Sequence, residues 1–390
     1  MDITVGNKTG AAIQAAINEA AARGGGRVSL EPGIHHCGTI RLRSNIELHI
    51  PAGAKIQGAD SPDAYDDFPH PFGVHPEEGK KALLVCHDAE NVSVTGRGEI
   101  NGAGPAFYDT DVPPGAFYAK PPHPRPRMAQ FHNCRNVLFE GVSFVDSPGW
   151  TFFLSECEDV VVSRVRVAGD QQMINNDGID IDSCRRVSVF DSFFRTGDDC
   201  IVLRAIRKDR ETPAVCERVV VSNCVLDSRC QGVRVGCPSD DTIRACRFEN
   251  IVFKGRGTGV IFEYPMRYLR KDCEGRICVS DISFNHISID SGGHPIRISC
   301  DPEIKPRRIA DISFRNIRAR GKSPVVLAGT PEHPLEDITL SGIDCEIEGD
   351  TPLVARFVRR LAMERVNLTA ATGEPVPFVR VPSLSWETKF

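Results

Sequence analysis

The sequence lacks several features that would each point to a particular class of protein. No apolar run approaches the roughly 20 residues that a membrane-spanning helix needs. The formal net charge is −5, from 47 basic and 52 acidic residues, so nothing favours a nucleic-acid or anionic-membrane partner. The first residues contain no basic segment that leads into an apolar core, as a secretion signal does. With 41% hydrophobic and 25% charged residues, the chain has the composition of a globular protein.

Cysteine is abundant, with 15 residues, yet the Cys-x-x-Cys pairs typical of metal sites are absent. Without a secretion signal, we expect free thiols in a reducing cytosol rather than disulfides, and therefore a cytoplasmic location. Four of these residues each stand three positions before a strand valine: Cys134, Cys157, Cys184 and Cys216. A metal site would explain this series, but an inward stack of buried thiols is favoured.

Most of the chain repeats one short phrase, in which a polar pair precedes a β-branched run and a polar break. Examples are "CRNVLFEG", "CEDVVVSR", "CRRVSVFD" and "IADISFRN". Between the clearest neighbours, the Val or Ile that opens each run recurs at gaps of 23, 27, 30 and 26 residues. This pattern predicts stacked strands, and its period is typical of a solenoid. The expected fold is all-β, a right-handed parallel β-helix.

The start of the chain and two irregular stretches complete this architecture. Residues 1–26 are expected to form an N-terminal capping helix region, with Thr9 as the N-cap and Gly24–Gly26 as the stop. Such a helix would cover the open apolar end of a solenoid. Residues 59–81 and 104–128 are rich in Pro, Gly and aromatic residues and predict long functional loops. Because no linker divides residues 1–390, a single domain is expected.

The segment "NNDGIDIDSC" carries three aspartates within six residues. If the isoleucines of this strand point inward, Asp180 and Asp182 point outward, and Asp177 lies at the preceding turn. The next coil contains "GDDC", where Asp198 follows Asp177 by 198 − 177 = 21 residues, close to one coil. Residues one coil apart lie about 4.8 Å apart along the axis. We therefore expect Asp177, Asp198 and Asp199 to converge on one patch of surface.

Carboxylates that lie close together repel one another, which raises the pKa of at least one and leaves a proton donor beside a base. Glycoside hydrolysis needs such an arrangement. Two other interpretations stay open: aspartates that hydrogen-bond their own turn, and a calcium site. Two acidic turns in register on adjacent coils favour the catalytic interpretation, in which no metal and no cofactor is expected.

The succession of "NNDGID", "GDDC" and "CQGVRVG" resembles glycoside hydrolase family 28, which contains polygalacturonases and rhamnogalacturonan hydrolases. The resemblance extends over most of the chain, including the N-terminal helix and "SPGWTFFLSECEDV". It implies an inverting hydrolase in which Asp198 is the general acid, while Asp177 and Asp199 hold and deprotonate the attacking water. Asn175 matches the asparagine of the first motif and would hydrogen-bond the acids or the sugar. Asp180 matches the last letter of that motif and is expected to support substrate binding.

Two departures from the family pattern concern the substrate. Gln231 stands where the family has a histidine between two glycines, and glutamine cannot titrate. Glu263 stands near the expected Arg-Ile-Lys motif and would repel a galacturonate carboxylate. Arg234, Arg267 or Arg270 would then have to bind that carboxylate in place of the missing cations.

Aromatic side chains usually form the platform beneath a sugar ring. Tyr264 and Tyr268 are the favoured candidates, and Phe262 lies in the same segment. For Trp150, packing against neighbouring residues is as well supported as contact with a sugar.

The expected function is therefore an inverting, exo-acting glycosidase whose partner is a pectin-derived or related oligosaccharide. Exo action is favoured because the two long loops would close one end of a cleft, and because a cytosolic enzyme would meet imported oligosaccharides. Two rivals remain. A polysaccharide lyase on the same fold would need a basic proton abstractor and often calcium, and a non-catalytic carbohydrate-binding β-helix is suggested by the missing His and Lys. The oligomeric state is not indicated.

Overall fold

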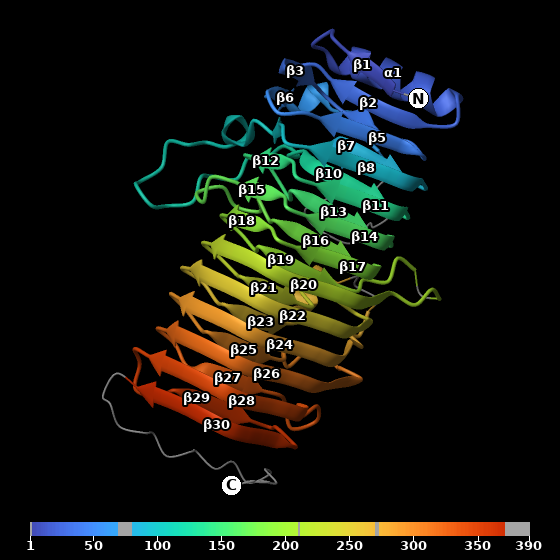
Figure 1. Ribbon diagram of the computed structural model, residues 1–390. Helices are drawn as coiled ribbons and strands as arrows, with labels where there is room; N and C mark the ends of the chain where they lie inside the picture. The colour runs from blue at the N-terminus through green and yellow to red at the C-terminus, as the bar shows by residue number, and fades with distance from the viewer. Residues whose placement is uncertain (1, 69–79, 210, 270–272, 371–390) are drawn as a thin grey trace. The chain divides into compact units, whose positions relative to one another are not determined.

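The computed structural model describes residues 2–68, 80–209, 211–269 and 273–370. The chain folds as a parallel β-helix of stacked strands with an N-terminal helix (Figure 1), which confirms the expected fold. Its contacts divide it into two compact units, residues 1–199 and 200–390, and each unit is described by itself. The expectation of a single domain remains a prediction.

Each complete coil of the first unit contains three strands, and each strand pairs in parallel with its counterparts in the neighbouring coils. The first stack comprises β1 (Asp2–Val5), β2 (Gly26–Leu30), β5 (Ile46–Ile50), β8 (Glu90–Gly96), β11 (Arg135–Glu140), β14 (Glu158–Ser163) and β17 (Arg185–Phe190). The second comprises β3 (Gly33–Cys37), β6 (Ala54–Gly58), β9 (Glu99–Asn101), β12 (Ser143–Val145), β15 (Arg166–Ala168) and β18 (Phe193–Thr196). The third comprises β4 (Ile40–Arg41), β7 (Ala82–His87), β10 (Arg127–His132), β13 (Phe152–Ser155) and β16 (Ile179–Asp182).

The second unit repeats a simpler coil of one long and one short strand. The long strands are β20 (Val215–Ser228), β22 (Thr242–Gly255), β24 (Cys278–Ser291), β26 (Arg308–Gly321), β28 (Glu336–Ile347) and β30 (Leu361–Ala370). The short strands are β19 (Ile201–Arg204), β21 (Val233–Val235), β23 (Val260–Glu263), β25 (Ile296–Ser299), β27 (Val325–Ala328) and β29 (Leu353–Arg356). Short 3-10 turns are η1 (Pro62–Ala64), η2 (Gly104–Phe107) and η3 (Met266–Tyr268).

The helix α1 (Gly10–Ala22) begins and ends as the sequence indicates. The hydroxyl of Thr9 accepts a hydrogen bond from the amide of Ala12 at 3.3 Å, which satisfies one of the free N–H groups of the first turn. Gly24 follows with a φ of +94°, a conformation that glycine adopts at little cost. Ile13 and Ile17 are fully buried on one face of the helix.

The repeated phrase of the sequence corresponds to one corner and one strand of each coil. The opening residues stack in register, as Val137 does on Val160 and Ile282 on Ile312. The polar residue just before each of them takes a left-handed conformation, with φ of +54° at Asn136, which Asn and Asp tolerate better than most residues. These corners form side-chain ladders, since the amide of Asn136 donates to that of Asn91 at 2.8 Å. The polar pair therefore turns the chain, and the β-branched run fills the core.

The four recurring cysteines lie inside the coils, as the sequence predicts. Cys134, Cys157, Cys184 and Cys216 are at most 2% exposed. In the first three, the thiol donates to the carbonyl oxygen two residues earlier, at 3.3 Å, and so satisfies a backbone acceptor at the corner. All 15 cysteines are free thiols. The cytoplasmic location itself remains a prediction.

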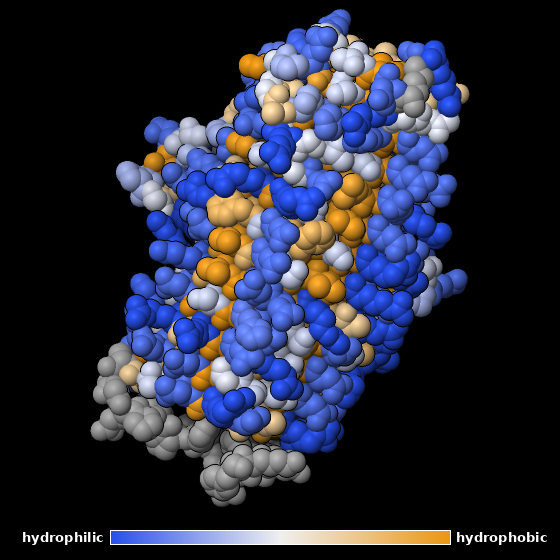
Figure 2. Space-filling model, viewed as in Figure 1, coloured by the Kyte–Doolittle hydropathy of each residue, from blue (hydrophilic) through white to orange (hydrophobic). Residues whose placement is uncertain are grey.

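The outer surface is mostly polar. On the face that Figure 2 shows, hydrophilic residues dominate and hydrophobic ones form smaller groups among them. Large apolar side chains that are exposed include Ile34, Phe117, Val220, Val225 and Val252. Within the described residues, no helix has the length and apolar character required to cross a membrane.

Candidate active site

Two turns of the first unit carry the three predicted catalytic aspartates, and Asn176 joins these turns. The fully buried side chain of Asn176 accepts hydrogen bonds from the amides of Gly197 (2.7 Å) and Asp198 (3.2 Å). Its own amide donates to the carbonyl oxygen of Asp170 at 2.9 Å. The amide of Gly178 also donates to the carbonyl oxygen of Asp199 at 2.8 Å. The turns of Asp177 and of Asp198–Asp199 are thus bonded to each other, as their spacing of one coil predicts. We call Asp177, Asp198 and Asp199 the acidic corner.

Gly197 allows the two turns to approach this closely. A Cβ atom at Gly197 would lie only 2.1 Å from the carbonyl oxygen of Met173, far inside any real contact. A side chain here would separate the turns and break the bond between the amide of Gly197 and Asn176. The glycine of "GDDC" is therefore a requirement of packing between coils.

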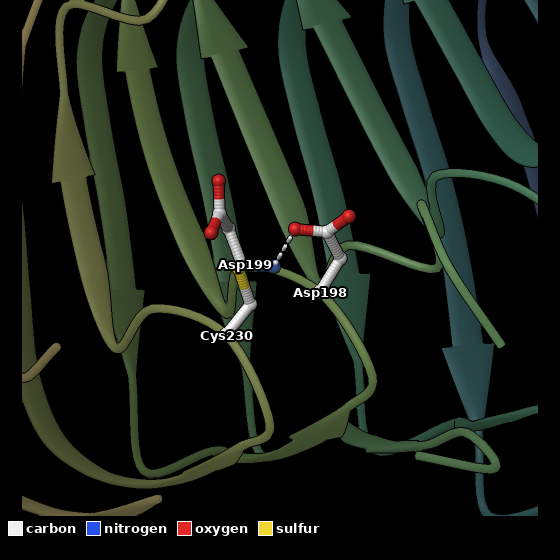
Figure 3. Close-up of side chains that lie close together, drawn as sticks. All are labelled: Asp198, Asp199 and Cys230. Atoms are coloured by element: carbon white, nitrogen blue, oxygen red, sulfur yellow. Dashed lines mark hydrogen bonds between the residues drawn. The ribbon is translucent and has the colours of Figure 1, made fainter. Parts of the chain in front are cut away.

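Asp198 accepts hydrogen bonds from neutral N–H groups at both of its carboxylate oxygens. Figure 3 shows the bond that the amide of Asp199 donates. Oδ2 of Asp198 accepts from the backbone amide of Asn175 at 3.0 Å and faces the side-chain nitrogen of Asn175 at 3.4 Å. Its Oδ1 accepts from the amide of Asp199 at 3.1 Å. Such donors favour the ionised form of a carboxylate, whereas neighbouring carboxylates favour the protonated form. These contacts hold both carboxylate oxygens of Asp198 in place.

The three aspartates differ in accessibility. Asp198 is half-buried, while Asp177 is 3% and Asp199 1% exposed. The carbonyl oxygen of Asp177 accepts from the amide of Thr151 at 2.8 Å, and the hydroxyl of Thr196 donates to the carbonyl oxygen of Asp198 at 2.6 Å. The backbone of the corner is thereby fixed, and Asp198 is the member that solvent reaches most.

Strand β16 buries its aspartates as well as its isoleucines. Asp180 and Asp182 are both 0% exposed. Asp180 therefore has no surface that a sugar could contact directly, and its predicted supporting role remains a prediction. Asp182 accepts a hydrogen bond from the hydroxyl of Ser183 at 2.7 Å and does not reach solvent. The strand alternation gives the direction of these side chains but not what covers them.

The predicted loop of residues 104–128 lies against the segment that leads into the acidic corner. The amide of Tyr118 donates to the carbonyl oxygen of Gln172 at 2.8 Å, and the side-chain nitrogen of Gln172 donates to the backbone carbonyl oxygen of Ala116 at 3.1 Å. The hydroxyl of Tyr118 donates to Asp170 at 2.8 Å, and this bond raises the pKa of Tyr118. In the other loop, residues 69–79 lie outside the described residues.

Sequence reasoning missed three residues beside this corner: Tyr108, Arg125 and Asn176. Asn176 stands next to the motif asparagine, and the doubled asparagine of "NND" is the one signal that could have indicated it. Arg125 hydrogen-bonds Ile174 and Asn175, which follow it by 49 and 50 residues. Tyr108 lies beneath the guanidinium of Arg125. Neither residue belongs to a repeating pattern, so the sequence gives no sign of these contacts.

The second unit contains the other predicted substrate-binding residues. Gln231 is half-buried, and its side-chain oxygen accepts a hydrogen bond from the amide of Thr258 at 3.0 Å. This contact ties the turn of Gln231 to the next coil. Gln231 therefore has a structural role, and its role toward a substrate remains a prediction.

Arg234 and Glu263 form an ion pair, with 2.6 Å between Nη2 and Oε2. Their side chains are 16% and 29% exposed, so solvent reaches both. Arg267 is exposed and its guanidinium lies 4.5 Å from the ring centre of Tyr268. Arg270, the third candidate cation, lies outside the described residues. The negative charge of Glu263 is thus balanced by one of the cations considered for the substrate carboxylate.

Most of the predicted aromatic platforms are buried. Tyr264 is 0% exposed, and burial raises its pKa well above the ordinary value. Its ring packs so closely on Gly236 that a Cβ there would lie 2.3 Å from it. The prediction that Tyr264 contacts sugar is therefore wrong. Phe262 is also fully buried, and Trp150 packs against Phe153. Tyr268 alone among these candidates is partly exposed.

Comparison with known proteins gives the family. The profile of glycosyl hydrolases family 28 matches residues 69–358, and these residues include the acidic corner. The chain belongs to glycosyl hydrolases family 28. A polygalacturonase of Persea americana is 23% identical over 258 residues, which cover 64% of this chain and 52% of that protein. The matched part of this family 28 chain covers 36% of a probable polygalacturonase of Arabidopsis thaliana, to which it is 29% identical, so the chain spans only part of the length of these relatives.

Solved structures show the same fold. An exopolygalacturonase of Thermotoga maritima superimposes with a TM-score of 0.74 at 22% identity, over 93% of the family 28 chain and 92% of its own. An endo-xylogalacturonan hydrolase of Aspergillus tubingensis superimposes with a TM-score of 0.68 at 16% identity, over 95% and 98%. At these identities the likeness establishes the β-helix fold alone.

Proposed function

We propose that this family 28 chain is an inverting glycosidase that hydrolyses pectin-derived or related oligosaccharides. The observation that carries the proposal is the acidic corner, where hydrogen bonds through Asn176 and Gly178 hold the turns of Asp177, Asp198 and Asp199 together. Family membership supports the same conclusion.

In this mechanism, the half-buried Asp198 protonates the glycosidic oxygen as the bond to the anomeric carbon breaks. Asp177 and Asp199 hold a water on the opposite face and accept its proton as it attacks. The cycle leaves Asp198 ionised and one buried carboxylate protonated, and proton exchange with solvent restores the starting state. General acid–base catalysis of this kind contributes about 10²- to 10⁴-fold in rate.

Exo action and an altered substrate subsite are further parts of the proposal. Loop 104–128 is bonded to the segment before the acidic corner, which supports a cleft restricted beside the catalytic residues. The ion pair between Arg234 and Glu263 supports weaker selection for a galacturonate carboxylate than a free arginine would give. Relatives and fold neighbours include both exo- and endo-acting enzymes, so they do not decide between the two modes.

Proton NMR of the first-formed sugar tests the reaction. With a panel of pectic oligosaccharides, we expect a product whose anomeric configuration is opposite to that of the cleaved linkage, released one residue at a time. Retained configuration would overturn the inverting mechanism, and a random spread of product lengths would overturn exo action.

The same reactions separate the two rival functions. A lyase would give an unsaturated product with new ultraviolet absorbance, and its activity would fall with a calcium chelator. We expect neither effect. A wild-type protein that binds these oligosaccharides but turns over none of them would favour the non-catalytic carbohydrate-binding solenoid.

A further inference from the structure

Arg125 lies at the end of loop 104–128, directly before β10, and makes a compact set of contacts. Its Nη1 donates to the carbonyl oxygen of Ile174 at 2.8 Å, and its Nη2 donates to the side-chain oxygen of Asn175 at 2.9 Å. Nη1 also contacts the hydroxyl of Tyr108 and the carbonyl oxygen of Pro148, the latter at 3.2 Å. The guanidinium carbon lies 5.1 Å from the ring centre of Tyr108. These contacts fix the plane and direction of a half-buried guanidinium.

Both acceptors on residues 174 and 175 are the far ends of groups that reach Asp198. The carbonyl of Ile174 and the N–H of Asn175 belong to one peptide unit, and this N–H donates to Oδ2 of Asp198 at 3.0 Å. The side-chain oxygen and nitrogen of Asn175 belong to one amide, and this nitrogen faces the same Oδ2 at 3.4 Å. The guanidinium of Arg125 is therefore connected to Oδ2 of Asp198 by two routes. One is the peptide unit between Ile174 and Asn175, and the other is the side-chain amide of Asn175.

The connection has two physical consequences. A donor at the oxygen end of an amide polarises the group and strengthens its N–H as a donor. The bond from Arg125 also determines which end of the Asn175 side chain faces Asp198, because a flipped amide would turn its oxygen toward the carboxylate. In addition, Asn175 has a φ of +60°, an uncommon conformation that its neighbours must maintain.

We propose that Arg125 is a positioning residue for the general acid, acting on Asp198 through the peptide and the side chain of Asn175. This inference rests on the proposed function, in which Asp198 protonates the leaving oxygen. Tyr108 helps to hold Arg125 in place, because its ring lies against the guanidinium. The hydroxyl of Tyr108 in turn donates to the carbonyl oxygen of Pro148 at 2.8 Å. Arg125 does not contact the reacting atoms in this role.

The test compares Arg125→Ala with wild type on aryl galacturonides whose leaving groups range from good to poor. If Arg125 acts through the general acid, the loss in kcat is about 10- to 100-fold for poor leaving groups and disappears for the best ones, which need no proton. We expect KM to change little and added guanidinium to restore part of the rate. An equal loss for every leaving group would indicate a structural role, and a rise in KM alone would indicate substrate binding; either would overturn the proposal.

Arg166→Ala is the matched control, because Arg166 is an exposed arginine of the same unit whose guanidinium lies 4.5 Å from the ring centre of Phe193. In the Arg166→Ala variant, kcat should depend on the leaving group as it does in wild type. Asp198→Asn in the same series tests the proposed function separately, since it should show the strongest dependence of all.

A crystal structure of the Arg125→Ala protein gives a readout that does not depend on turnover. We expect the side chain of Asn175 to turn and its contacts with Asp198 to lengthen or break. If both contacts persist unchanged, the positioning role is overturned even if turnover has fallen. If they break while Asp198→Asn retains full activity, the contact role is upheld and the assignment of the general acid fails instead.

Discussion

Two pairs of adjacent aspartates, one in each unit, look alike in sequence and differ in their surroundings. Asp198 and Asp199 lie in "TGDDC", and Asp240 and Asp241 lie in "PSDDT". Asp199, Asp240 and Asp241 are each at most 4% exposed. In the second pair, Asp241 forms ion pairs with Arg207 at 2.6 Å and with Arg307 at 2.7 Å.

Two further partners of Asp241 also lie in the second unit. Asp241 accepts from the hydroxyl of Thr242 and from the amide of Ala214, at 2.9 and 3.1 Å. Asp198 instead accepts from the amides of Asn175 and Asp199. A buried carboxylate paired with two arginines holds segments of the chain together. Under the proposed function, Asp198 exchanges a proton while Asp241 is structural, and the surroundings of the two pairs, rather than their sequence, then account for the difference.

Asp198→Asn should have the largest effect on rate. Asparagine retains the shape and an acceptor oxygen but cannot protonate a leaving group, so we expect kcat to fall about 10²- to 10⁴-fold. The unfolding temperature should stay near that of wild type. Reducing-sugar release and a thermal melt on the same preparation measure both quantities. A variant with near wild-type turnover would remove Asp198 from the chemistry and abolish the contrast with Asp241.

Asp241→Asn should show the opposite profile. It leaves Arg207 and Arg307 without their shared carboxylate, and we expect a loss of about 3 kcal/mol in unfolding free energy. That value lies at the lower end for broken buried pairs, because both arginines are partly exposed. Turnover per folded molecule should not change. Urea unfolding, with kcat normalised to the folded fraction of the same preparation, separates the two effects, and a loss of kcat at unchanged stability would contradict the structural role.

Asn176→Ala tests whether catalysis by Asp198 and Asp199 also requires the hydrogen bonds that Asn176 accepts from the amides of Gly197 and Asp198. The variant leaves the buried amides of Gly197 and Asp198 without their acceptor, at a cost of about 2 kcal/mol. We expect kcat to fall by about 10-fold or more, because small displacements of catalytic groups are costly. Asn367→Ala, which removes an exposed bond to Asp344, is the control. Full activity in the Asn176 variant would show that the acidic corner holds its geometry without this residue.

The fold was accessible from the sequence because each coil uses the same physical solution. A polar residue that tolerates a left-handed turn precedes an inward Val or Ile, and such a pattern can be read locally. The repeated phrase does not reveal the coil of β22, because Cys246 occupies the core position where the next coil has Ile282. A thiol fills that position well, but it does not fit a pattern based on branched residues.

The candidate site was only partly accessible from the sequence. The spacing of Asp177 and Asp198 reveals the coil period, whereas Arg125 reaches residues 174 and 175 by a contact that only the folded loop creates. Tyr264 was misplaced for a related reason. Its position after a strand places it near the expected cleft, but the absence of a side chain at Gly236 lets its ring turn into the protein.

Of these variants, Glu263→Gln should change activity and stability least. It extends the comparison of buried and solvent-accessible carboxylates to the partly exposed ion pair of Arg234 and Glu263. The ion pair with Arg234 is reached by solvent, so we expect less than about 1 kcal/mol of lost stability. Because the substitution leaves Arg234 with an uncompensated charge, KM for a galacturonate oligosaccharide should fall by about two- to five-fold, the equivalent of such an energy. KM for the same oligosaccharide with its carboxylates reduced to alcohols should not change. Glu249→Gln, at an exposed site bonded to Asn285, is the control for charge alone. An equal fall in KM for both substrates, or for both variants, would show that Glu263 does not govern selection for the carboxylate.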